Sequence, residues 1–173
     1  MTAKQMKRSW RQRVKPGARD LCWLIVFVLI SSTAVDWWRS RDIDTSQVPV
    51  ESVHLLDGRQ QDLVAMSQHD PVLVYVWASW CGVCRFVTPS VDWLSGHAQV
   101  VLFALRSGSD KHLAGYLAHH GYDFPVVNDR HGNLSDAFSV TVTPTVMVIE
   151  QGKITSITTG FTTPLGLWLR LVL

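Results

Sequence analysis

Long runs of apolar residues mark the strongest secondary-structure signals in this chain. Val72–Trp77 is apolar throughout apart from the tyrosine hydroxyl, and Gln99–Leu105 is apolar after its first residue. Such continuous runs are typical of strands that are buried on both faces of a sheet. Two further strands are predicted at Thr145–Ile149 and Lys153–Thr159, with a turn at Gln151-Gly152 between them.

Helical spacing of apolar residues predicts three helices in the same part of the chain. The first begins at Cys81 and stops at Gly96. Pro164–Leu173 forms a final amphipathic helix. The helix between them has Ser109 as its N-cap and carries one apolar stripe, made of Leu113, Tyr116, Leu117 and His120.

Weaker patterns complete the expected fold. Val50–Leu56 and Arg59–Met66 read as two extended pieces joined by an Asp57-Gly58 turn, which predicts a hairpin. Phe124–Asp129 is a short extended piece, and Leu134–Phe138 is one or two helical turns. Strands that alternate with helices and end in a hairpin and a helix predict an α/β sandwich, with a central mixed β-sheet flanked by helices.

The N-terminal part of the chain differs sharply in charge from the rest. The chain carries +2 overall, yet its first 20 residues hold seven basic side chains and one acidic side chain. The apolar stretch Leu21–Ile30 follows, and Trp37 and Trp38 come shortly after it. A basic flank, an apolar run and interfacial tryptophans are typical of a membrane segment whose positive side stays in the cytoplasm.

We therefore expect one N-terminal transmembrane helix before the folded domain. The predicted organisation is a basic cytoplasmic tail at 1–20, an anchor at 21–38, a polar linker at 39–47 and a folded domain at 48–173, outside the membrane. A cleaved signal peptide is the alternative, because Ser32-Thr-Ala34 is a tolerable cleavage site. Since the basic tail runs directly into an apolar segment, we expect a membrane and no nucleic acid as its partner.

Two cysteines supply the candidate chemistry of the domain. Cys81 and Cys84 lie two residues apart, directly after the strand that ends at Trp77, and can close a small reversible disulfide at the mouth of a helix. A thiolate attacks a disulfide, and the N-terminus of a helix favours negative charge. We expect Cys81 in the exposed first turn as the nucleophile, Cys84 as the more buried resolving thiol, and Trp80 as a shield for the sulfurs.

Two other roles compete for the cysteine pair. Half of a zinc site would need two more ligands at similar spacing, and the domain has no second Cys-x-x-Cys pair. A static disulfide would add little stability, because so small a loop restricts the unfolded chain little. The expected redox group is therefore the Cys81–Cys84 pair, without a metal or another cofactor.

A proline far from the cysteines is the second feature of interest. Pro144 directly precedes a buried strand, where it cannot donate a hydrogen bond to the sheet. An X-Pro bond is also the only peptide bond that adopts the cis form at low cost. From the residues alone, a cis bond and a plain strand-opening proline both remain open.

Together these motifs resemble the thioredoxin-like family. Trp77-Ala-Ser-Trp-Cys-Gly-Val-Cys-Arg85 with Pro89 resembles its active site, Val142-Thr-Pro-Thr145 its cis-proline loop, and Gly160 the glycine after its last strand. The resemblance spans residues 48–173 and implies a thioredoxin-like fold. It further implies that Pro144 is cis and packs against the cysteines, and that Thr143 offers its backbone to a partner protein. Trp80, Thr143 and Pro144 are thus the expected substrate-binding residues.

The anchor and the Asp-Gly hairpin resemble the tethered TlpA-like thiol-disulfide oxidoreductases. Within that group, three segments are similar to the bacterial suppressor-of-copper-sensitivity proteins of the ScsD type: Ala104–Gly108, Phe124–Asp129 and the C-terminal Thr158–Leu173. This resemblance implies a Gram-negative periplasm, an inner-membrane location and a link to copper tolerance.

The expected activity is disulfide reduction of protein substrates. Because the periplasm is oxidising, a reduced pair needs a membrane electron donor, by resemblance one of the DsbD or ScsB type. A disulfide oxidase or isomerase and a non-catalytic copper-handling module are the alternatives, the latter because copper(I) favours thiolates.

Two positions depart from the thioredoxin pattern. Tyr75 stands where thioredoxin has a buried acid, and a tyrosine cannot accept a proton at neutral pH. Val83 stands where thioredoxin has a proline between the cysteines. The residues between the cysteines tune the reduction potential, so a strongly reducing potential does not follow from the resemblance.

Overall fold

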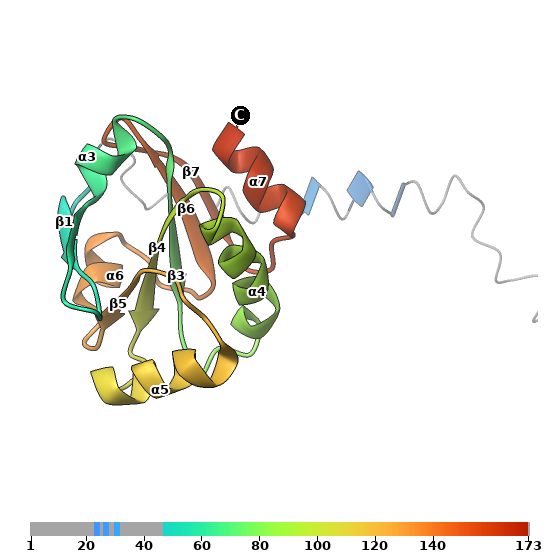
Figure 1. Cartoon of the computed structure of the whole chain (residues 1–173). Coiled ribbons are helices and arrows are strands. Elements are labelled where there is room, and N and C mark those ends of the chain that lie inside the picture. The colour runs from blue at the N-terminus through green and yellow to red at the C-terminus, as the bar shows by residue number, and fades with distance from the viewer. Residues whose placement is uncertain (1–22, 25, 28–29, 32–46, 173) are drawn as a thin grey trace, which may run out of the picture. The chain divides into compact units, whose positions relative to one another are not determined.

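The computed structural model describes residues 23–24, 26–27, 30–31 and 47–172 (Figure 1). The chain divides into two units, Met1–Trp38 and Arg39–Leu173. In the first unit, the described residues are helical. Among all described residues, no helix has the length and apolar character needed to cross a membrane. The predicted basic tail, most of the predicted anchor and nearly all of the linker lie outside the described residues.

A five-stranded mixed sheet forms the centre of the domain, as the apolar runs predict. Its order is β5-β4-β3-β6-β7, with β3 (Val72–Trp77) in the middle. On one side β4 (Gln99–Leu105) and β5 (Val126–Asp129) run parallel to β3. On the other side β6 (Thr145–Glu150) pairs antiparallel with β3, and β7 (Lys153–Thr159) pairs antiparallel with β6 in the predicted hairpin. The short extended piece expected at 124–129 is thus an edge strand of the sheet.

Side chains of β3 alternate between two apolar clusters, one on each face of the sheet. Leu73, Tyr75 and Trp77 lie in the cluster that includes residues of α4 (Cys84–Ser95), α5 (Asp110–His120) and α7 (Pro164–Val172). The other face holds Val72, Val74 and Val76, packed with residues from β1 (Ser52–His54), α3 (Leu63–Ser67) and the end of α6 (Asn133–Ala137). Both faces of the strand that leads to the cysteines are therefore buried.

The expected N-terminal hairpin is correct only in its first part. β1 pairs antiparallel with β2 (Gln60–Asp62) across the Asp57-Gly58 turn, but the chain then coils into α3 where a strand was expected up to Met66. The Asp62 carboxylate accepts a hydrogen bond from the Ala65 N–H at 2.8 Å, which caps the helix. Leu63 is fully buried and fixes the first turn against the sheet.

The apolar stripe expected on α5 is wrong at its last member. Leu113 and Leu117 are buried, whereas His120 is exposed. The His120 ring stacks between Tyr116 and Tyr122, with ring centroids 4.2 and 5.6 Å away. Its Nδ1 lies 2.9 Å from the Tyr116 carbonyl oxygen. The imidazole ring of His120 thus has stacking and hydrogen-bonding partners at the surface, so burial in the core is not required.

A buried carboxylate holds the end of β5 to the start of α6. Asp129 is 4% exposed and accepts hydrogen bonds from the Ser135 N–H at 2.8 Å and the Ser135 hydroxyl at 2.7 Å. Asp129→Ala should lower the free energy of unfolding by about 2–3 kcal/mol, because it leaves buried donors without an acceptor. Denaturant unfolding at pH 7 measures this, with the exposed Asp136→Ala as the control. Equal losses in the two variants would contradict this role of Asp129.

Candidate active site

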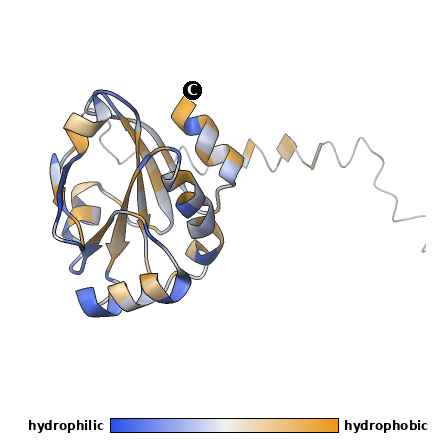
Figure 2. Cartoon of the chain, in the orientation of Figure 1, coloured by the Kyte–Doolittle hydropathy of each residue, from blue (hydrophilic) through white to orange (hydrophobic). Residues whose placement is uncertain are grey.

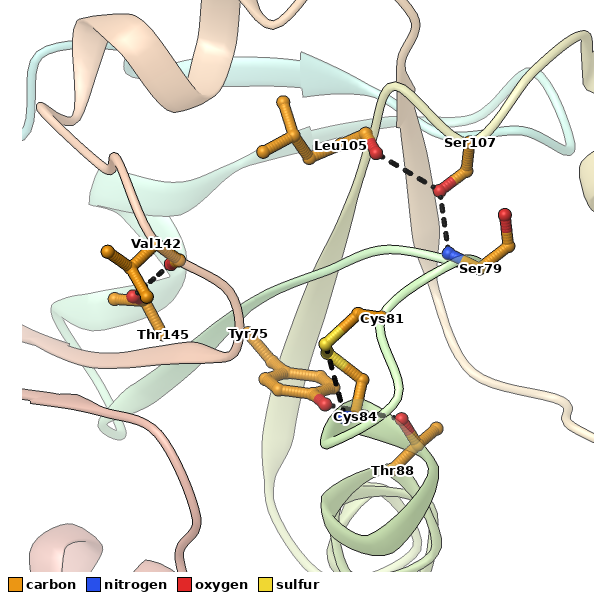
Figure 3. The surroundings of a disulfide bond; sticks show 9 residues. All are labelled: Tyr75, Ser79, Cys81, Cys84, Thr88, Leu105, Ser107, Val142 and Thr145. Atoms are coloured by element: carbon orange, nitrogen blue, oxygen red, sulfur yellow. Dashed lines mark hydrogen bonds between the residues drawn. A yellow bond between two sulfur atoms is a disulfide. The ribbon is translucent and has the colours of Figure 1, made fainter.

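The cysteine motif lies at the carboxyl end of β3, in the turn that leads into α4 (Figure 3). Cys81 and Cys84 are joined by a disulfide, and their Cα atoms are 5.3 Å apart. Cys84 is the more buried of the two, 1% exposed against 6% for Cys81, in the order that the sequence predicts. The disulfide therefore lies at the end of the central strand, at the edge of the core. Of the two cysteines, Cys81 is the one that is accessible to solvent in part.

The sequence predicts Cys81 in the exposed first turn of the helix, and this prediction is wrong. Cys81 precedes the helix and is largely buried. α4 begins at Cys84, while Cys81 precedes it and donates its N–H to the Ala78 carbonyl at 3.1 Å. That turn brings the Cys81 sulfur over the helix end, where the Cys84 N–H donates to it at 3.2 Å. Because the first N–H groups of a helix have no partner within the helix, this donor is available to stabilise a thiolate on Cys81.

A second loop, between β4 and α5, holds the motif in place. The Ser79 N–H donates to the Ser107 hydroxyl at 3.0 Å, and that hydroxyl donates to the Leu105 carbonyl at 3.2 Å. The Trp80 indole N–H donates to the Arg106 carbonyl at 3.2 Å. Trp80 is 62% exposed, so its ring lies at the surface beside the motif.

Ser107 and Arg106 were not identified as site residues from the sequence. Ser107 is 2% exposed although it lies in a loop, and Arg106 has a φ of 46°, which few residues other than glycine adopt. Both follow directly after β4, the parallel neighbour of β3. The carboxyl ends of parallel strands meet at the same edge of a sheet. The position of Arg106 and Ser107 directly after β4 was therefore the one signal in the sequence that could have indicated their role.

A neutral hydroxyl pair occupies the place of thioredoxin's buried acid. Tyr75 is fully buried, and its hydroxyl lies 3.2 Å from the Thr88 hydroxyl, one helical turn after Cys84. Figure 3 shows the Tyr75 side chain pointing toward Cys84 and Thr88. Burial raises the pKa of Tyr75 well above its usual value, and the Thr88 hydrogen bond opposes that only in part. Tyr75 therefore stays protonated at neutral pH and cannot act as a base, and either hydroxyl can be the donor in its hydrogen bond with Thr88.

Tyr75→Phe should change how stability depends on pH at alkaline values. In the unfolded chain Tyr75 ionises near pH 10, the usual value, whereas in the folded chain its pKa is higher. The unfolded state alone gains charge above that pH, so this group makes the free energy of unfolding fall as pH rises above about 10. Urea unfolding at pH 8 and pH 11 should show a smaller loss in Tyr75→Phe than in the unaltered chain. Tyr116→Phe is the control, because the Tyr116 side chain lies partly exposed on α5, and equal losses in all three chains would contradict the buried phenol.

The Thr143–Pro144 peptide bond is cis, as the thioredoxin resemblance implies. Pro144 is buried, and its carbonyl accepts a hydrogen bond from the Gly160 N–H at 2.8 Å. Thr143 is partly exposed. The Thr145 hydroxyl donates to the Val142 carbonyl at 2.7 Å, and both residues belong to the surroundings of the disulfide drawn in Figure 3. The structure thus brings the cis-proline loop to the same edge of the sheet as the cysteines.

Metal binding was tested on the residues that the structure describes. Among them, no group of three or more His, Cys, Asp or Glu side chains is arranged to hold a metal ion.

Comparison with known proteins places the chain in one family. The model of the Redoxin family matches residues 44–164. A thioredoxin-like protein of Haemophilus influenzae is 34% identical over 148 residues, which cover 85% of this chain and 87% of that protein. A chloroplastic M-type thioredoxin of Zea mays is 27% identical over 154 residues, covering 84% and 81% of the two chains.

Solved structures agree on the fold. A secreted Mycobacterium tuberculosis disulfide oxidoreductase homologous to Escherichia coli DsbE superposes with a TM-score of 0.60 at 20% identity, over 70% of this chain and 93% of that one. The exposed lipoprotein thioredoxin Etrx1 of Streptococcus pneumoniae gives a TM-score of 0.59 at 23% identity, over 70% and 96%. The chain belongs to the Redoxin family, and it is a thioredoxin-like disulfide oxidoreductase.

Proposed function

We propose that this chain is a membrane-tethered reductase of protein disulfides that works in the bacterial periplasm through Cys81 and Cys84. The observation that carries the proposal is the Cys81–Cys84 disulfide at the start of α4, with the Cys84 N–H donating to the Cys81 sulfur. A donor in that place stabilises negative charge on Cys81 once the disulfide is opened. Cys81 is therefore the attacking thiolate and Cys84, the more buried, is the resolving thiol.

The reaction runs in two exchange steps that together transfer two electrons. The Cys81 thiolate attacks one sulfur of a partner's disulfide, a mixed disulfide forms, and the other partner sulfur leaves as a thiolate that takes up a proton from water. Cys84, deprotonated, then attacks the Cys81 sulfur. The Cys81–Cys84 disulfide forms, the partner leaves with its second thiol, and both partner cysteines are reduced.

Trp80, Thr143 and Pro144 are the proposed substrate-binding residues. Trp80 is exposed beside the motif, and the cis-proline loop lies at the same edge of the sheet. The backbone of the partly exposed Thr143 is suited to pair with an extended segment of the partner, in a strand-like mode. Such pairing forms hydrogen bonds to the backbone of the partner and does not depend on particular side chains, so it is suited to many protein substrates.

The tether and the compartment are proposed from the N-terminal sequence. A basic tail at 1–20 and an apolar segment at 21–38 are typical of a single-pass inner-membrane anchor with its N-terminus in the cytoplasm. The catalytic domain then lies in the periplasm. After each reaction the Cys81–Cys84 disulfide of a reductase must be reduced again, so we propose a membrane electron donor of the DsbD or ScsB type.

The redox state of the cysteine pair in cells tests the direction of the reaction. Thiols are blocked with a heavy alkylating reagent in intact cells, and the shift of the full chain is read on a gel. A reductase that receives electrons should be found mainly as the dithiol. A disulfide oxidase would be found mainly as the disulfide, and that result would overturn the proposed direction.

A link to copper tolerance is the narrower part of the proposal. It rests on the similarity of three segments, Ala104–Gly108, Phe124–Asp129 and Thr158–Leu173, to ScsD-type proteins. As a reductase, the protein would repair disulfides that copper oxidation forms wrongly. A copper-handling module would instead bind copper(I) stoichiometrically and show no thiol exchange, so the two roles are separated by one exchange assay and one copper titration.

A further inference from the structure

Well-exposed large hydrophobic side chains are confined to one part of the domain. Within the described residues 47–172 there are ten of them: Trp80, Val83, Phe86, Trp93, Val142, Phe161, Leu165, Trp168, Leu169 and Val172. They belong to the cysteine motif, α4, the cis-proline loop and the segment that ends in α7. The described surfaces of β1, β2, α3, α5 and α6 hold none. So uneven a distribution marks a surface that contacts something apolar.

α7 turns an apolar stripe toward solvent rather than toward the core. Leu165, Trp168, Leu169 and Val172 are spaced as i, i+3, i+4 and i+7, so they lie on one side of the helix. They are 65, 46, 38 and 57% exposed, whereas Leu167 on the opposite side is fully buried. In Figure 2 orange, hydrophobic parts of α7 alternate with blue and pale ones. One face of α7 therefore fixes the helix to the domain, and a second apolar face has no partner within the described residues.

α4 lies beside α7 and extends the same surface to the active site. The two helices pack against each other on one face of the sheet (Figure 1). Phe86 and Trp93 are exposed on α4, and Val83, one of the two residues between the cysteines, is exposed directly before it. A pocket of about 550 Å³ opens between the C-terminal ends of the helices, lined among others by Leu94, Trp168 and Val172. We call the exposed apolar residues of these two helices the α4–α7 face.

The described part of the domain begins at the end of the sheet where α4 and α7 end, but on the opposite face, since Val48 belongs to the cluster with β1 and α3. The first residues of the domain are held where the Val48 N–H donates to the Gly152 carbonyl at 3.3 Å, directly before β7. The C-terminal half of α7 is bonded to β7, because Arg170 donates to the Ser156 hydroxyl at 2.7 Å. The nine residues 39–47 can span at most about 30 Å. An anchor at 21–38 would therefore hold the start of the domain within that distance of the bilayer.

We propose that the α4–α7 face rests on the surface of the bilayer that holds the anchor, an inference that rests on the tethering in the proposed function. Trp93 and Trp168 suit the level of the lipid headgroups, where an apolar ring with a polar N–H is favoured. The charged side chains of the two helices are Arg85, Asp92 and Arg170, and Asp70 lines the pocket between them, so the face carries no net negative charge that would repel anionic lipids. The face would hold the cysteine motif at the membrane surface, where a membrane electron donor presents its thiols.

The test uses the full chain in vesicles of phosphatidylethanolamine and phosphatidylglycerol. A photoreactive benzoylphenylalanine replaces Trp168 in one protein and the exposed Asp136 of α6, on the opposite face of the sheet, in the matched control. After illumination, mass spectrometry counts lipid adducts at each position. The proposal predicts at least tenfold more lipid adduct at position 168. Disulfide reduction by the same vesicles is measured in parallel.

Each outcome bears on the inference separately from the proposed function. Equal lipid adducts at both positions, or adducts of position 168 to a second copy of the chain, would overturn the membrane contact while leaving a measured reductase activity intact. Selective lipid adducts without disulfide reduction would support the contact and overturn the reductase. A chain that does not stay with the vesicles in a flotation gradient would overturn the contact together with the tether.

Discussion

Cys81→Ser is expected to lower the rate of protein disulfide reduction by at least about a thousandfold, because it removes the atom that forms the mixed disulfide. A serine oxygen cannot form a stable bond to sulfur in its place. The remaining thiol, Cys84, is 1% exposed and cannot reach a partner protein without opening the domain. The rate is measured as reduction of a folded protein disulfide by the full chain, in the presence of a small dithiol that recharges the pair.

Cys22→Ser is the matched control for that experiment. It removes the third cysteine of the chain, which lies in the predicted anchor outside the active site. The control should keep the rate of the unaltered chain, and far-ultraviolet circular dichroism should show the same secondary structure in both variants. Activity of Cys81→Ser within a few-fold of the unaltered chain would contradict the role of Cys81 as the nucleophile.

Cys84→Ser is expected to hold partner proteins on the chain as mixed disulfides. In this variant Cys81 still attacks, but no thiol is left beside it to release the partner, so turnover stops after the first exchange step. The N–H of residue 84 is a backbone group and can still donate to the Cys81 sulfur, so the attack itself should remain fast. Without an added dithiol, Cys84→Ser should therefore complete the first exchange step but release no reduced partner.

Non-reducing gels and mass spectrometry read the trapped partners directly. Full-length Cys84→Ser is produced in cells, thiols are blocked, and complexes that disappear on reduction are identified. The variant that lacks both Cys81 and Cys84 is the control and should trap nothing. If the single variant also formed no reducible complexes, Cys84 would not be the resolving thiol and the two-step exchange would be wrong.

Sequence patterns were sufficient for the central part of the fold. β3 and β4 are continuous apolar runs, and burial on both faces follows from that composition without knowledge of the partners. The cysteine motif and Pro144 could be placed because each lies next to such a run. α3 was missed because the Asp62 cap and the burial of Leu63 decide its conformation, and a five-residue helix is too short to show a period.

Contacts that cross the sequence could not be predicted. Ser107 bonds to Ser79, 28 residues away, and Tyr75 bonds to Thr88 on a different element. No local pattern encodes either pair, since each depends on which strands are neighbours. The amphipathic period of α7 was evident in the sequence. The sequence did not show which side of α7 is buried. In the structure Leu167 is the side chain of α7 that is buried against the domain, so most of the remaining apolar side chains face solvent.

Cys81 and Cys84 should exchange two electrons with each protein disulfide that they reduce, and direct counting of the products tests this. The reduced full chain is mixed with a protein that carries one disulfide, the reaction is stopped with acid, and peptide masses of both proteins are followed over time. For each chain that forms the Cys81–Cys84 disulfide, one substrate molecule should gain two thiols. A substrate that stays oxidised, or that is reduced while Cys81 and Cys84 keep both thiols, would contradict the account.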